Sequence, residues 1–214
     1  NLAPHVYSKL LRWDANIENI LPDLAEGLPE QVDEVTYTYK LKPDTKFSDG
    51  SPLTSQDVKF TYERIADPET GSPHSTKTGP LASIETPDDR TITFKLSKPF
   101  APFVSFTATG WMFILSQKFV EAKGNRFQEV LGSGPYVIAS RQKDVSTQLK
   151  RNPHHHDPER PYPDELDFRI IPDASTIDAA VIANELDILP SATDASRIQA
   201  ILSANPNLLD IEHA

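Results

Sequence analysis

The feature that most constrains the fold is a change of hydrophobic period between residues 35 and 65. In EVTYTYKLK, apolar and aromatic side chains alternate with Thr and Lys, and a period of two is typical of a strand with one buried and one solvated face. In SQDVKFTYERI, Val58, Tyr62 and Ile65 recur at the spacing of one helical face. Both periods occur in one short stretch, so the sequence predicts an α/β protein.

Turn and capping residues join these two elements. Asp49 and Gly50 form a favoured turn pair because glycine accepts a positive φ. Thr54 followed by Asp57 predicts a capping box, and the Asp-Pro pair at 67–68 predicts the helix end. The carboxylates of Asp49 and Asp57 could also be metal ligands, but their spacing fits neither an EF-hand nor a two-histidine motif. We therefore predict a structural role for this stretch.

Further strands are predicted wherever the alternation returns. They cover residues 92–96, 136–138, 145–149 and 166–170, with short strands at 186–190 and 207–213. In the first, Ile92, Phe94 and Leu96 share a face. Val145, Thr147 and Leu149 share a face of the third, and Leu166, Phe168 and Ile170 a face of the fourth.

Helical spacing predicts three more helices. The first covers residues 2–11, with Leu2, Val6, Leu10 and Leu11 on one face. The second begins at Ser175, paired with Asp178 as a cap, and ends at Asn184 in the left-handed conformation. The third runs from Asp194 to about Ala204 and stops at an Asn-Pro pair.

Three stretches resemble sites without completing one. GSGPYVI lacks the Lys-Ser/Thr ending of a phosphate loop and leads into a strand. The uncharged, aromatic-rich segment 101–116 fits a buried connection or the wall of a binding cleft, and composition favours the connection. His154, His155 and His156 lie in a Pro-rich, charged stretch that predicts an exposed loop; adjacent histidines cannot all face one ion.

Charge and composition argue against several kinds of partner, chemistry and structure. A net charge of −10 argues against nucleic acid or anionic lipid as the main partner. The absence of cysteine excludes disulfides and thiolate chemistry. No apolar run approaches the roughly 18 residues of a membrane helix, which predicts a soluble chain. The first residues carry no signal-peptide pattern and open within a predicted helix, so we expect the natural N-terminus to be missing.

Several segments, in order, carry a resemblance: LAEGL, YTYKLKPDTKFSDGSPLTSQDVKFTYERIADPETGSP, TITFKLSKPFAPF, GSGPY, LKRNP and FRIIPDASTIDAAVIANELDI. Together they resemble the extracellular solute-binding proteins of family 5, the oligopeptide, dipeptide and nickel receptors of ABC importers. The resemblance implies a periplasmic-binding-protein-like type II fold, with mixed sheets and flanking helices. Residues 1–8 and 117–214 would form a partial base lobe and residues 9–116 an inserted smaller domain, with the opposite lobe absent.

The resemblance also implies a function. The chain would belong to the substrate-binding component of an ABC importer, capturing peptides for uptake without catalytic residues, metal or cofactor. Its partners would be a peptide or other small solute, a membrane permease and the opposite lobe. The location would be periplasmic or extracellular, with lipoprotein tethering in the full-length form. Alternatives are nickel complexes, oligosaccharides or opines as cargo, an interaction module, or a peptide hydrolase whose catalytic set we do not find.

Candidate ligand contacts follow from the same resemblance. The family places an aromatic residue in the loop GSPHS, where this chain has a histidine, and two further segments border the cleft. A surface or core role is the alternative for each residue. The candidates are His74, Thr109, Gly110, Trp111, Pro190 and Ser191. The chain departs from the family after RNP, where His155 and His156 replace an aromatic pair; we expect this to change packing more than specificity.

Overall fold

The computed structural model describes residues 2–123, 129–161, 163–189 and 194–208. The chain divides into two compact units. The first unit comprises residues 1–140 and 148–166, and the second comprises 141–147 and 167–214. The expected boundaries of the inserted domain, residues 9–116, stay a prediction.

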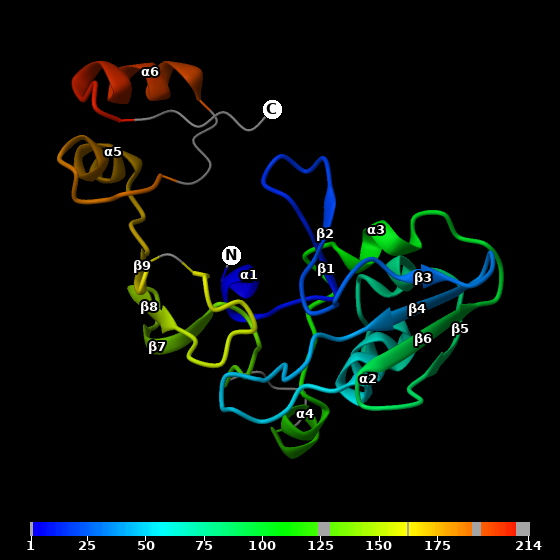
Figure 1. The fold of residues 1–214 in the computed structure, drawn as a ribbon. Coiled ribbons are helices and arrows are strands. Elements are labelled where there is room, and N and C mark those ends of the chain that lie inside the picture. The colour runs from blue at the N-terminus through cyan, green and yellow to red at the C-terminus, as the bar shows by residue number, and fades with distance from the viewer. Residues whose placement is uncertain (1, 124–128, 162, 190–193, 209–214) are drawn as a thin grey trace. The chain divides into compact units, whose positions relative to one another are not determined.

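The elements mix helices and short strands, so the predicted α/β class is confirmed (Figure 1). The strands are β1 (Leu11–Trp13), β2 (Ile20–Pro22), β3 (Glu30–Gln31), β4 (Thr36–Lys40), β5 (Leu81–Glu85), β6 (Thr91–Leu96), β7 (Tyr136–Gln142), β8 (Ser146–Arg151) and β9 (Glu165–Arg169). The α-helices are α1 (Ala3–Val6), α2 (Ser55–Ala66), α3 (Phe103–Thr107), α4 (Gln117–Lys123), α5 (Ala174–Ile182) and α6 (Ala195–Ala204). Two 3₁₀ turns are η1 (Pro68–Thr70) and η2 (Ser75–Thr78).

The main sheet of the first unit has the order β3-β4-β6-β5, and all its neighbours are antiparallel. Tyr37 pairs with Phe94 and Tyr39 with Ile92, and all four side chains are buried. Helix α2 packs against β5 and β6 (Figure 1). The ring centroids of Tyr62 and Phe94 lie 4.8 Å apart. Burial of each such side chain stabilises the fold by roughly 1.5–3 kcal/mol. The predicted inward faces of β4 and β6 are confirmed.

The junction between the sheet and α2 also follows the prediction. Gly50 has a φ of 85°, and Thr54 and Asp57 form the capping box. Asp57 additionally accepts a bond from the Gln117 amide at 3.0 Å, which ties the start of α2 to α4. Burial raises the pKa of Asp57 in spite of these bonds. The helix ends at Ala66, directly before the Asp-Pro pair.

The predicted helix over residues 2–11 is wrong beyond its first turn. Helix α1 ends after four residues, and the chain then becomes extended and enters β1. Carbonyl groups that a longer helix would use are bound elsewhere: Gly134 donates to Val6 at 2.9 Å and Ile114 donates to Ser8 at 3.0 Å. Tertiary hydrogen bonds therefore replace the helical ones that the apolar spacing predicts.

The cap of α5 differs from the prediction. Asp173, not Ser175, is the N-cap, and its carboxylate accepts from the Thr176 amide at 2.8 Å. Ser175 lies inside the first turn and donates its hydroxyl to the same carboxylate. The carboxylate, which has two oxygens, is the stronger acceptor. Asn184 has a φ of 57°, as predicted.

Other predictions in the second half of the chain have mixed outcomes. Helix α6 follows the cap Asp194 and ends before an Asn-Pro pair, as predicted. The predicted strand at 186–190 is wrong for the described residues 186–189, where Ile188 is 76% exposed. Thr147 and Leu149 are buried as expected, but the predicted companions Val145 and Ile170 are exposed. The predicted strand at 207–213 lies mainly outside the described residues, and its first two residues form no strand.

Candidate functional site

The glycine-rich loop at 132–134 holds the start of the chain in place. A side chain at Gly132 or Gly134 would overlap the backbone of Val6, so glycine is required by close approach. Gly134 donates to the Val6 carbonyl at 2.9 Å, and the Ser8 hydroxyl donates to the Ser133 carbonyl at 3.2 Å. The loop is thus a backbone junction within the first unit, in agreement with the rejection of a phosphate loop.

The histidine run is less exposed than predicted. His154 is exposed, but the ring of His155 lies 3.2 Å from the Ser133 carbonyl. The Nε2 atom of His156 lies 3.2 Å from the Asp23 carboxylate, and their side chains are only 6% and 13% exposed. The expectation of an exposed loop is therefore wrong for His155 and His156.

A buried asparagine explains why this loop is docked. The Asn152 side-chain amide donates to the Gly134 carbonyl at 2.8 Å, and its carbonyl oxygen accepts from the His154 amide at 2.9 Å. Most buried polar groups in proteins are hydrogen-bonded, and this side chain is bonded at both its nitrogen and its oxygen. Asn152 thereby fixes the histidines against the glycine-rich loop.

The Asp23 environment favours the charged carboxylate. Burial alone would raise the pKa of Asp23, but the hydrogen bond and charge of His156 outweigh it, helped by the Lys9 amide at 2.8 Å, so the pKa lies below its usual value. Burial, followed by the charge of His156, lowers the pKa of His155. Among the described residues, no group of three or more acidic, histidine or cysteine side chains could hold a metal ion.

Two of the predicted ligand contacts lie against each other. The rings of His74 and Trp111 are stacked, with centroids 4.3 Å apart and an interplanar angle of 18°. The Lys77 amine lies 5.1 Å from the Trp111 ring centroid, a cation–π geometry. Trp111 is nevertheless 48% exposed. We call His74, Lys77 and Trp111 the aromatic face.

Local structure positions both halves of the aromatic face. His74 precedes η2, and its carbonyl accepts from the Lys77 amide at 2.9 Å. Gly79 ends this turn with a φ of 67°, and a side chain there would collide with the Phe100 ring. On the other side, the buried Met112 anchors the backbone next to Trp111.

Thr109 and Gly110 lie on the turn that carries Trp111. The Thr109 hydroxyl donates to the Phe106 carbonyl at 2.8 Å, whereas Gly110 is exposed. Segment 101–116 is only partly a buried connection, since Met112 is buried and Trp111 reaches the surface. Its role as the wall of a binding cleft stays a prediction. The remaining predicted contacts, Pro190 and Ser191, lie outside the described residues.

One feature of the aromatic face could not be read from the sequence. The Nδ1 atom of His74 is buried and has no hydrogen-bond partner in the described part of the chain. The aromatic face offers a flat ring system with an adjacent cation, which suits binding through stacking.

Within the described part of the chain, no helix is both long and apolar enough to cross a bilayer.

Comparison with known proteins places the chain in a family. Residues 19–211 match the profile of the bacterial extracellular solute-binding proteins, family 5, middle region. The chain belongs to this family. A Brucella ovis relative whose name describes an ABC transporter peptide-binding protein is 30% identical over 187 residues. The match covers 84% of this chain and 35% of that family 5 relative.

Solved structures agree with the family assignment. The binding protein MoaA from A. tumefaciens R10, in complex with mannopinic acid, has a TM-score of 0.86 at 27% identity, covering 96% of this chain and 42% of that one. Haemophilus influenzae OppA, in complex with the peptide RPPGFSPFR, has a TM-score of 0.81 at 25% identity, covering 94% and 44%. The predicted type II fold is therefore confirmed. The chain spans less than half the length of these family 5 proteins.

Proposed function

We propose that this chain is part of the substrate-binding component of an ABC importer that captures peptides outside the cytoplasmic membrane. Membership of family 5 supports the general role, because the family consists of extracellular solute-binding proteins. The peptide cargo is supported by the peptide-binding relative and by the peptide-bound neighbour. The permease partner and lipoprotein tethering of the full-length form are parts of the same proposal.

The observation that carries the proposal is the aromatic face. His74 and Trp111, two separate predicted ligand contacts, form one stacked pair. Exposed, rigid aromatic groups contribute large contact areas at low entropic cost. We propose that Thr109 and Gly110 lie beside the cargo, and that Pro190 and Ser191 contact it as well.

The proposed mechanism is capture without covalent chemistry. Residues 1–8 and 117–214 would belong to one lobe and residues 9–116 to the inserted domain, while the opposite lobe would lie outside this chain. A ligand that makes more contacts in the closed state shifts the population towards closure, which the permease would then read. No catalytic residue, metal or cofactor is assigned.

Cargo other than peptide is the nearest alternative. An opine has a specific observation in its favour, since MoaA was solved in complex with mannopinic acid. Nickel complexes and oligosaccharides remain alternatives at the level of the family. The histidine run does not favour nickel, because the buried His156 is directed to Asp23.

The test compares the 214-residue chain with the longer gene product that carries it. We expect calorimetry to show tight binding of a short peptide only for the longer protein, and weak or no binding for the 214 residues. Trp111→Ala in the longer protein should lower affinity about tenfold or more. Trp13→Phe is the control, because Trp13 packs partly buried against the core.

Two results would contradict the proposal. Micromolar binding of peptide by the 214 residues would show that no opposite lobe is needed. Turnover of a labelled peptide by the longer protein would indicate a hydrolase. An opine that binds more tightly than every peptide tested would replace the cargo while retaining the aromatic face.

A further inference from the structure

A cavity of about 430 Å³ lies within the first unit, apart from the aromatic face residues. This volume falls in the range of small-molecule sites. Its lining is rich in cations although the chain carries a net charge of −10. The charged lining residues are Lys9, Arg12, Lys42 and Arg160, against Asp23 and Asp157.

Both carboxylates of the cavity are engaged by the protein. Asp23 accepts from the Lys9 amide and faces His156. Asp157 lies 3.8 Å from the Arg160 guanidinium. These carboxylates offset the charge of Lys42 only in part, because each also has a closer partner.

Two cationic side chains of the cavity lack a close partner. The side chains of Arg12 and Lys42 have no hydrogen-bond or ion-pair partner in the described part of the chain, and both are half-buried. The Lys9 amine, by contrast, donates to the Ala108 carbonyl at 3.0 Å. Burial is the main cause that lowers the pKa of Lys42. The charges of Asp23 and Asp157 raise this pKa in part, and the charge of Arg12 lowers it. A bound anion would offset both costs.

The remaining walls suit an organic ligand. Tyr7 and Phe113 line the cavity, and their ring centroids lie 5.8 Å apart. The Lys9 amine lies 5.7 Å from the Phe113 ring. Phe113 therefore lines the cavity two residues after Trp111 of the aromatic face.

We propose that this cavity binds the carboxylate of a small organic ligand, with Arg12 and Lys42 as its two ion-pairing contacts. Arginine and lysine donors next to an apolar wall match a carboxylate on a short carbon skeleton. A dianionic phosphate fits less well, because Asp23 and Asp157 would repel its second charge. The assignment does not require that the cargo be a peptide.

The experiment measures ligand binding to the 214-residue chain by NMR titration. Propionate, tri-alanine, tri-alanine amide and inorganic phosphate are the probes. We expect saturable shifts at millimolar concentration with the carboxylates and none with the amide. Tri-alanine binding without propionate binding would identify a peptide C-terminus as the source, and equal binding would identify free small carboxylates.

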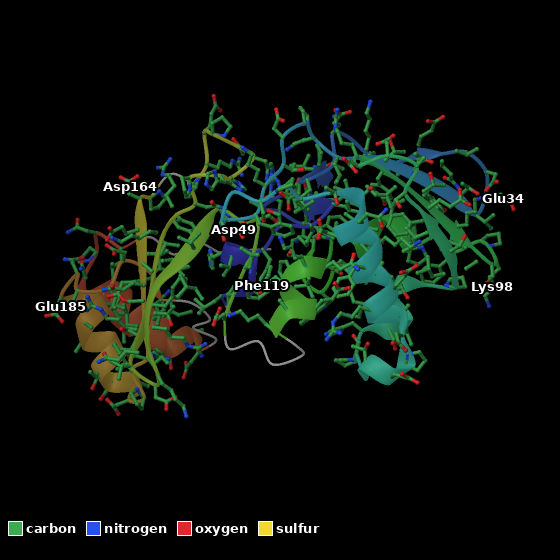
Figure 2. All side chains as sticks on the ribbon, turned by 90° about the horizontal axis from the view of Figure 1, so that it is seen from below. Glu34, Asp49, Lys98, Phe119, Asp164 and Glu185 are labelled. Atoms are coloured by element: carbon green, nitrogen blue, oxygen red, sulfur yellow. The ribbon has the colours of Figure 1, made fainter. Side chains whose placement is uncertain are left out.

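Variants locate the binding. The double substitution Arg12→Gln and Lys42→Gln should weaken carboxylate binding about tenfold or more, since hydrogen bonds to charged groups are lost. The control double substitution Lys98→Gln and Lys118→Gln makes the same charge change at exposed positions. Lys98 lies at the other end of the first unit from Asp164, the neighbour of the cavity residue Pro163 (Figure 2).

The outcomes that overturn the inference do not depend on the variants folding. In the unaltered chain, no saturable shift with any carboxylate, equal binding of tri-alanine and its amide, or tighter binding of phosphate would each reject the carboxylate site. Equal loss of binding in both double variants would reject the assignment to Arg12 and Lys42. The proposed importer role fails separately, through Trp111→Ala or peptide turnover in the longer protein.

Discussion

The two units differ in how they are held together. The first unit buries a continuous apolar core between its main sheet, α2 and α3, and this core includes Tyr39, Tyr62 and Phe94. In the described part of the second unit, Val181 and Ile201 are the only buried apolar side chains. Two other large apolar side chains of that unit, Ile170 and Ile188, are instead 57% and 76% exposed.

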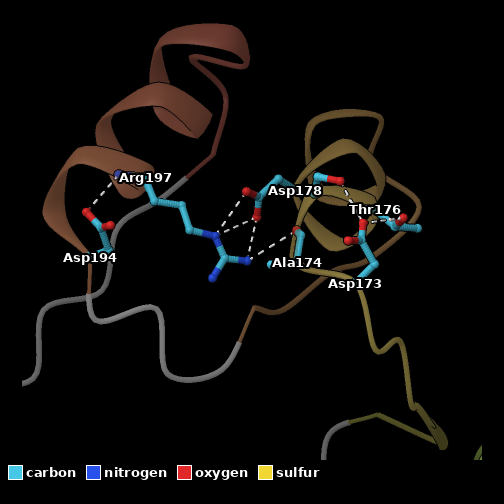
Figure 3. Close-up of polar contacts among 7 residues, drawn as sticks. Asp173, Ala174, Thr176, Asp178, Asp194 and Arg197 are labelled. Atoms are coloured by element: carbon cyan, nitrogen blue, oxygen red, sulfur yellow. Dashed lines mark hydrogen bonds and ion pairs between the residues drawn. The ribbon is translucent and has the colours of Figure 1, made fainter.

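Polar contacts contribute a larger share of the stabilising interactions in the second unit. The Arg197 guanidinium binds the Asp178 carboxylate through two nitrogens, at 2.8 and 2.6 Å (Figure 3). Aspartate caps begin both helices, and hydrogen bonds to hydroxyl groups lower the pKa of Asp173 to about 2. Such partly exposed polar contacts stabilise less than a buried core. We therefore expect the first unit, which carries the aromatic face and the cavity, to be the more stable of the two.

The largest expected effect tests the core of the first unit. Phe94→Ala should lower the free energy of unfolding by about 3–5 kcal/mol, because it leaves a cavity where the Phe94 ring meets three other aromatic rings. Urea unfolding monitored by circular dichroism measures the change. Ile188→Ala is the matched control in the second unit and should stay within about 0.5 kcal/mol. Similar losses of stability in both variants would contradict the difference between the two units.

A smaller effect is expected at the Asp23 and His156 pair. Asp23→Asn should cost about 1–3 kcal/mol near neutral pH, since the amide keeps only one acceptor oxygen for the Lys9 amide and His156 and removes the charge. The folded-state pKa of Asp23 lies below its unfolded value, so its contribution is complete above the unfolded pKa. That contribution is lost as the pH falls through the folded pKa.

The pH dependence gives this prediction its control. Urea midpoints measured from pH 7 down to pH 2 should fall less steeply for Asp23→Asn than for the unaltered chain. Asp44→Asn is the comparison, because Asp44 is exposed. Parallel curves for the two variants would mean that Asp23 contributes no pH-dependent stability.

The second unit is tested by Asp178→Asn, with a more local result. Loss of the ion pair with Arg197 should raise amide hydrogen exchange a few-fold in α5 and α6, while exchange in β4 and β6 stays unchanged. Exchange mass spectrometry resolves the two regions. A rise in β4 and β6 of the same size would show that the units unfold together.

The smallest stability effect is expected at the aromatic face. His74→Ala should change the free energy of unfolding by less than about 1 kcal/mol, because it removes one stacked pair at the surface. In the proposed full-length receptor, peptide affinity should fall much more. His154→Ala, at an exposed histidine, is the control. A large loss of stability with unchanged affinity would assign His74 to structure alone.

The elements that the sequence predicts well are those with signals inside a few neighbouring residues. The alternation around Tyr37 and Tyr39, the capping box at Thr54 and the end of α6 all depend on adjacent residues, and all are confirmed. The helix predicted over residues 2–11 is wrong because Gly134 and Ile114, distant in sequence, take its carbonyl groups. Local apolar spacing carries no information on such competition.

The candidate site shows the same division. The resemblance selects His74 and Trp111 one at a time, but their stacking requires η2 and segment 101–116 to meet. No sequence pattern predicts that His156 pairs with Asp23, or that Arg12 lines a cavity.

From the sequence alone follow the α/β class, the type II fold by resemblance, the capped helix α2 and the absence of thiol chemistry. Only the tertiary structure decided which side chains share a cavity, which histidine is buried and which aromatic rings stack. The physical reason is the sequence separation between the residues that interact. Period, turn and cap are fixed by neighbours along the chain, whereas burial and charge pairing are fixed by segments that only folding brings together.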